Sequence, residues 1–193
     1  MGNPIGSKKP NYSFTKMYEK STLISILESY LRLIKSNPEE EKVQTFLKNN
    51  PIFFHIFSPF RIINKSPIFN IFTTDFAIIS TTGTLYLIEI EKPNKPILKK
   101  DGGRTSEFNH PFDQVTDWLH VIRDHRSAVL DMLDIKTKDV TNIRGVVIYG
   151  IEENEDEKAL RKFKATDFGQ IDFYTFTDIA KNVQTLIENF EDI

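Results

Sequence analysis

Acidic residues stand in two neighbouring segments of the sequence that have the composition of strands. Glu89 and Glu91 close the segment LYLIEIE, and Asp75 opens the segment DFAIIS upstream of it. Side chains alternate between the two faces of a strand, so Glu89 and Glu91 share one face with Leu85 and Leu87, with their Cα atoms about 6.6 Å apart. The register of the two segments decides whether Asp75 lies beside Glu89.

Three carboxylates this close together repel one another, which raises their pKa unless a cation neutralises them. Oxygen ligands suit Mg²⁺ or Mn²⁺, and an ion held in this way can bind a phosphate and deprotonate water. The chemistry indicated is phosphodiester hydrolysis. The alternative is that these acids are solvated strand ends paired with nearby lysines, and the spacing alone does not decide between the two.

The segments around the acids predict an α/β domain. Apolar residues at intervals of three and four predict helices near residues 15–36, 38–49, 111–133, 155–164 and from 177 onward. Strands are expected near residues 67–72, 75–80, 85–91, 144–151 and 171–175. Thr82 and Gly83 predict a hairpin turn, Asn37 and Glu40 a capping box, and Thr177 the cap of the last helix. Strands this apolar need helices on both sides of the sheet.

The composition bounds the organisation and the class of the protein. Residues 1–13 are expected to form a disordered tail, and residues 14–193 a single domain with an N-terminal helical extension. With 25 Lys and Arg against 27 Asp and Glu, any nucleic-acid site must be a local patch. The absence of cysteine excludes disulfides and thiolate zinc sites. No segment has the length of a membrane span, and a cytoplasmic location is expected.

A polar segment at residues 93–107 joins the acidic strand to the next long helix. The basic residues in and beside it are Lys92, Lys95, Lys99, Lys100 and Arg104. Positive charge of this kind suits contacts with DNA phosphates, and a loop of this length is usually functional or mobile. We expect the loop to be mobile without a ligand and to order on nucleic acid; a solvated loop with no such role is the alternative.

Six segments follow one another between residues 39 and 179: EEEKVQTFLKNNP, TDFAII, LYLIEIEKP, FDQVTDWLHVI, GVVIYG and IDFYTFTDI. Their order and spacing resemble the Shedu-type nuclease domain of the PD-(D/E)XK superfamily. The resemblance implies a mixed αβββαβ core flanked by helices, with an extra N-terminal helix. It also implies a metal-dependent nuclease that hydrolyses DNA in anti-phage defence.

The same resemblance implies roles for individual residues. Asp75 and Glu89 would be ligands of Mg²⁺ or Mn²⁺, and Glu91, which stands where the family usually has Lys, would add a ligand or position the attacking water. Gln114 would orient a ligand or a phosphate, and Glu40 would be the helical acid. The departure at Glu91 leaves a second hypothesis, a catalytically inactive nuclease-fold module that binds DNA or a protein partner. The sequence leaves homo-oligomerisation open.

Overall fold

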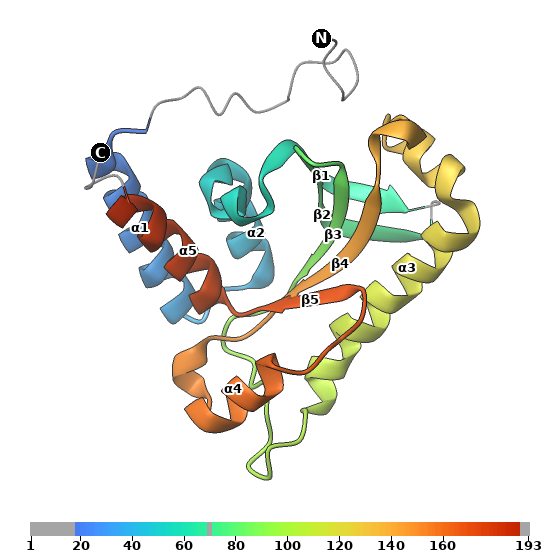
Figure 1. Ribbon diagram of the computed structural model, residues 1–193. Coiled ribbons are helices and arrows are strands. Elements are labelled where there is room, and N and C mark those ends of the chain that lie inside the picture. Colours follow the sequence, from blue (N-terminus) through green and yellow to red (C-terminus); the bar gives the residue numbers. More distant parts are fainter. Residues whose placement is uncertain (1–17, 69–70, 190–193) are drawn as a thin grey trace.

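The computed structural model describes residues 18–68 and 71–189, and a five-stranded mixed sheet forms its centre (Figure 1). The strands follow one another across the sheet in chain order: β1 (Pro59–Ile68), β2 (Phe72–Ser80), β3 (Thr84–Ile90), β4 (Asn142–Ile148) and β5 (Ile171–Tyr174). The first three form an antiparallel meander, whereas β3, β4 and β5 are parallel. The predicted mixed α/β fold is confirmed.

Helices cover both faces of this sheet (Figure 1). They are α1 (Lys20–Lys35), α2 (Glu40–Asn49), α3 (Ser106–Met132), α4 (Glu157–Lys164) and α5 (Phe176–Asn189), with short 3-10 helices η1 (Pro51–Phe57), η2 (Thr137–Asp139) and η3 (Glu152–Asn154). Helices α1, α2 and α5 pack with η1 on one face, and α3 and α4 pack on the other. No helix within residues 18–68 and 71–189 combines the length and the apolar character that a membrane span requires.

Alternation along β2 and β3 builds the two apolar layers. Phe76 and Ile88 face the layer of α1, α2 and α5, whereas Ala77 and Leu87 face α3. The hairpin between these strands turns at Gly83, whose φ of 85° favours glycine, as predicted. A hairpin buried on both faces has one strongly favoured register, because a slip by one residue would turn every side chain to the other face.

The range predicted for the edge strand β1 is wrong. The predicted strand at 67–72 combines the end of β1 with the start of β2, and β1 begins at Pro59. Much of β1 is half-buried or exposed, so it lacks the apolar pattern that marks the central strands. Helix α3 begins at Ser106 rather than at 111, because the Thr105 hydroxyl accepts a hydrogen bond from the Phe108 N–H at 3.2 Å.

Two predicted helix caps are also wrong. Asn37 has a φ of 52° and lies outside α2, which begins at Glu40 with Glu39 at the N-cap position. Helix α5 is capped by Thr175 rather than by Thr177, since the Thr175 hydroxyl accepts from the backbone N–H of Asp178 at 3.1 Å. The N-cap of α2 lies two residues after the predicted one and makes no side-chain capping hydrogen bond, so the predicted capping box is absent. The tail predicted at 1–13 lies outside the described residues.

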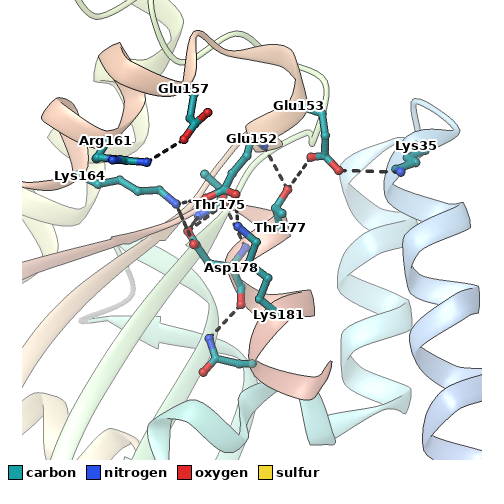
Figure 2. Close-up of polar contacts among 11 residues, drawn as sticks. Lys35, Glu152, Glu153, Glu157, Arg161, Lys164, Thr175, Thr177, Asp178 and Lys181 are labelled. Carbon is teal, nitrogen blue, oxygen red and sulfur yellow. Dashed lines mark hydrogen bonds and ion pairs between the residues drawn. The ribbon is translucent and has the colours of Figure 1, made fainter. Parts of the chain in front are cut away.

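A cluster of charged side chains joins α4 to η3 and to the start of α5 (Figure 2). The Lys164 ammonium pairs with Glu152 and with Asp178, whose Oδ2 lies 2.6 Å away, and Lys181 also pairs with Glu152. About a quarter of the Lys164, Glu152 and Asp178 side chains is exposed, so these pairs are partly shielded from water. The cluster fixes the last strand and its two flanking helices relative to one another.

Candidate active site

The β2–β3 hairpin brings Asp75 and Glu89 side by side. The pairing of the two strands runs from Ile79 opposite Leu85 to Phe76 opposite Ile88, so Asp75 and Glu89 are the next residues in register. Beyond the last backbone pair, the Asp75 side chain bonds to β3, because its Oδ2 accepts a hydrogen bond from the Ile90 N–H at 2.8 Å. The two acids therefore lie together where the backbone ladder of the hairpin ends.

Helix α2 adds a third acid through a buried glutamine. The Gln44 amide donates to Asp75 Oδ1 at 2.6 Å and to Glu40 Oε1 at 2.7 Å. Gln44 is 4% exposed, and its own carbonyl oxygen is buried without a partner. The sequence indicated Glu40 but missed Gln44. The available signal was the spacing of four residues, which places both side chains on one side of a helix.

Glu89 is held from the opposite helical layer. Its Oε1 accepts a hydrogen bond from Gln114 Nε2 of α3 at 3.0 Å, so the structure brings Gln114 to the acids. Glu89 is 9% exposed, and its Oε2 is buried with no hydrogen-bond partner. An unpartnered buried carboxylate oxygen is costly in a folded protein and marks a position where a proton or a cation belongs.

The acids raise one another's pKa. Burial raises the pKa of Glu89 to about 9, and the negative charges of Asp75, Glu40 and Glu91 add to the effect. Burial also raises the pKa of Asp75 to about 7, opposed by the hydrogen bond from Ile90 and by the charge of Lys65. The pKa of Glu40 is raised by burial and then by Glu91. Without a cation, the cluster therefore retains protons at neutral pH.

Glu91 has a different environment from the other acids. Its Oε2 lies 2.6 Å from the Lys95 ammonium, and Lys92 is paired with Glu39 at 2.5 Å. Among the residues that the structure describes, no group of three or more His, Cys, Asp or Glu side chains is arranged to hold a metal ion. The predicted trio of Asp75, Glu89 and Glu91 is thus not preassembled, and its third member is paired with a lysine.

The remaining acid pair still suits a divalent ion. Mg²⁺ usually keeps several waters and takes one or two protein carboxylates together with substrate phosphates, rather than a complete protein cage. Asp75 and Glu89 supply two carboxylates held by neutral donors, and Glu89 Oε2 has no partner. Glu40 lies next to them through Gln44. The donor set is made of oxygen atoms, which Mg²⁺ and Mn²⁺ prefer.

The polar segment 93–107 is folded against the body of the domain. Leu98 and Arg104 form an antiparallel bridge, and Ile97 is completely buried. The Glu155 carboxylate accepts hydrogen bonds from the backbone N–H groups of Ile97 and Leu98, at 2.6 and 3.2 Å. The sequence predicted a long polar loop and missed this anchoring. A further ordering of the segment on nucleic acid stays a prediction.

The basic residues of this segment have unequal surroundings. Lys99 and Lys100 are exposed, and they are free to reach a phosphate in a way that the paired Lys92 and Lys95 are not. The Arg104 guanidinium lies 4.9–5.3 Å from the ring centres of an aromatic cage, which consists of Phe112, Phe163 and Phe168. Arg104 therefore packs against the α3 and α4 side of the domain.

The fold and the clustered acids define a mixed α/β domain of nuclease-like architecture, with its polar site at the end of a central hairpin. The family model for the C-terminal part of the Shedu protein SduA matches residues 37–179, a span that contains Glu40, Asp75, Glu89 and Gln114. The chain belongs to this Shedu family, which confirms the resemblance seen in the sequence. Membership suggests a role in anti-phage defence. A search of curated proteins found none that matches the chain.

Proposed function

We propose that this protein is a nuclease that uses Mg²⁺ or Mn²⁺ to hydrolyse DNA in anti-phage defence. The observation that carries the proposal is the pair of adjacent, largely buried acids, Asp75 and Glu89, with the unpartnered Glu89 Oε2 between helical layers. Acids with strongly raised pKa values that also lie together are typical of functional sites. Their position within the residues matched by the Shedu family supports the same function.

In this proposal Asp75 and Glu89 hold the ion. When bound, the ion supplies a Lewis acid for the phosphate and lowers the pKa of a coordinated water. The Ile90 N–H and the Gln44 amide orient Asp75, and the Gln114 amide orients Glu89. Both carboxylates are therefore fixed before an ion arrives, which reduces the reorganisation that binding requires.

The remaining predicted residues act around this pair. Glu40 adds negative charge that strengthens cation binding, and it shares the Gln44 amide with Asp75. Glu91 adds a ligand or positions the attacking water once Lys95 is drawn away from it towards a DNA phosphate. Exposed lysines Lys99 and Lys100 extend the contact along the DNA backbone, which supplies affinity without sequence readout.

Nicking of supercoiled plasmid in the presence of Mg²⁺ or Mn²⁺ tests this function. The Asp75→Asn and Glu89→Gln variants keep the shape of each side chain and remove its charge, so we expect cleavage to fall by at least about 100-fold. Glu41→Gln, an exposed neighbour of Glu40, is the matched control and should cleave like the wild type. Full activity in both site variants would show that cleavage does not depend on these acids.

A second candidate function has a specific observation in its favour. Glu91 occupies the position where the family usually has Lys, it is paired with Lys95, and no preassembled trio of acids is found among the described residues. A catalytically inactive module that binds DNA or a protein partner would have these features. Calorimetric titration with Mn²⁺ separates the two functions. The nuclease should bind the ion and lose this binding in Glu89→Gln, whereas an inactive module should show no binding in the millimolar range.

A further inference from the structure

Hydrolysis of a phosphodiester increases the negative charge on the reacting phosphate, and a nearby positive side chain stabilises that charge. The lysines closest in sequence to the acids are already engaged. Lys92 is paired with Glu39, the N-cap residue of α2, and Lys95 is paired with Glu91. A lysine outside these two ion pairs would supply positive charge to the Asp75–Glu89 site without first breaking a pair.

Strand β1 supplies a lysine opposite Asp75. The pairing of β1 with β2 places Asn64 opposite Phe76 and Ser66 opposite Thr74, so Lys65 falls opposite Asp75. The Cα atoms of opposite residues in an antiparallel pair lie about 4.5–5.5 Å apart, a distance that a lysine side chain can span. The charge of Lys65 acts on both Asp75 and Glu40, lowering the pKa of each.

The conformation of Lys65 is unusual for its residue type. Its φ is 49°, in the left-handed region that Gly and Asn adopt more readily than Lys. Non-glycine residues held in this region are concentrated at functional sites. Lys65 is exposed, and within the described part of the chain its ammonium group makes no hydrogen bond or ion pair. Lys65 thus combines a left-handed backbone with a charge that acts on the two acids and is not held in an ion pair with any described residue.

We infer that Lys65 contacts the scissile phosphate at the Asp75–Glu89 site and stabilises its negative charge during hydrolysis. The inference rests on the proposed nuclease function. Lys65 approaches from the edge of the sheet, so it can bind a phosphate oxygen while Asp75 and Glu89 hold the ion. Lys65 thereby supplies positive charge from β1, whereas Lys92 and Lys95, the lysines that follow Glu91, are held in ion pairs.

Two variants of Lys65, one variant of Lys95 and one control variant test this contact in the full-length chain. Lys65→Asn tolerates the left-handed backbone, so it should fold with unchanged or higher thermal stability while plasmid cleavage falls by about 100-fold. Lys65→Arg keeps the charge and should retain part of the activity. Lys48→Gln, an exposed lysine elsewhere on α2, should cleave like the wild type. Lys95→Met removes the lysine paired with Glu91 and tests whether cleavage depends on that charge instead.

The outcomes distinguish this inference from the proposed function. If the wild type cleaves DNA and Lys65→Asn cleaves it within threefold of the wild-type rate, the role of Lys65 is overturned and the nuclease assignment stays intact. The same holds if cleavage is lost only in Lys95→Met. If the wild type does not cleave, the nuclease assignment fails. The phosphate contact of Lys65 is then tested by measuring the binding of a labelled DNA duplex in Ca²⁺. Weaker binding with a salt slope reduced by about one unit in Lys65→Asn would support the phosphate contact. Unchanged affinity and slope, or no DNA binding by the wild type, would refute it.

Discussion

The buried Glu89 side chain, whose Oε2 has no hydrogen-bond partner among the described residues, leads to a prediction about stability that can be tested without a substrate. We expect Glu89→Gln to stabilise the metal-free protein at neutral and alkaline pH. The amide of Gln resembles the protonated acid in shape and charge, so the variant avoids both the proton uptake that folding requires of Glu89 at neutral pH and the burial of its charge at higher pH. The Gln114 amide keeps an acceptor, since the new side chain retains one oxygen.

The magnitude follows from the pKa of Glu89, which rises from an ordinary 4.5 to about 9 in the folded protein. Between these two values the folded state binds more protons than the unfolded state, so stability falls as pH rises. The fall is about 1.4 kcal/mol per pH unit, which gives an upper bound of roughly 3 kcal/mol at pH 7. Partial access of water to the site reduces this, and we expect a gain of about 1–3 kcal/mol in the variant.

Urea unfolding between pH 4 and pH 9 measures this gain. The unfolding free energies of Glu89→Gln and the wild type should coincide near pH 4, where Glu89 is protonated in both states, and should diverge as pH rises. The exposed control Glu41→Gln should show no such divergence. Mg²⁺ or Mn²⁺ should stabilise the wild type and not Glu89→Gln. A variant that is less stable at every pH, or a gain independent of pH, would refute the account of Glu89 as a carboxyl whose raised pKa costs stability as pH rises.

Three further substitutions test the contacts around the site. Gln44→Leu removes the amide shared by Asp75 and Glu40 and should weaken Mn²⁺ binding about 10–100-fold in calorimetry; unchanged binding would show that the amide does not orient the acids. Arg104→Ala should lower the unfolding free energy by about 1–2 kcal/mol in urea through loss of the aromatic cage contacts, and a neutral result would assign Arg104 to the surface. Lys99→Gln combined with Lys100→Gln should weaken DNA binding most at low salt in fluorescence anisotropy and reduce the salt slope by about two units, whereas an unchanged slope would mean that DNA approaches elsewhere.

The central hairpin is the part of the fold that local sequence predicts best. The nearly continuous apolar segments on either side of Thr82 and Gly83 predict both strands and the turn between them. Once the hairpin is fixed, the positions of Asp75 and Glu89 follow from its register. The site could be approached from sequence because its two principal acids lie on adjacent strands of a hairpin, where short-range pairing determines spatial proximity.

The contacts that hold the acids depend on distant elements and were harder to predict. Gln44 lies 31 residues before Asp75 along the chain, and Glu155 anchors Ile97 from 58 residues away. Their side chains have no local pattern that specifies these partners. Lys65 was missed for a related reason. It lies in an edge strand whose mixed polarity hides the strand itself, so its position opposite Asp75 appears only with the β1–β2 register.

The acids of the site differ in the kind of donor that holds them, and this difference has a chemical consequence. Asp75 and Glu89 accept hydrogen bonds from neutral groups, a backbone N–H and two amides, whereas Glu91 is paired with an ammonium group. A neutral donor orients a carboxylate without cancelling its charge, so the raised pKa of Asp75 and Glu89 persists and a divalent ion can relieve it. An ion pair cancels the charge and leaves less to gain from a metal. The organisation of these contacts therefore favours the hairpin pair over Glu91 as the place where a cation binds first.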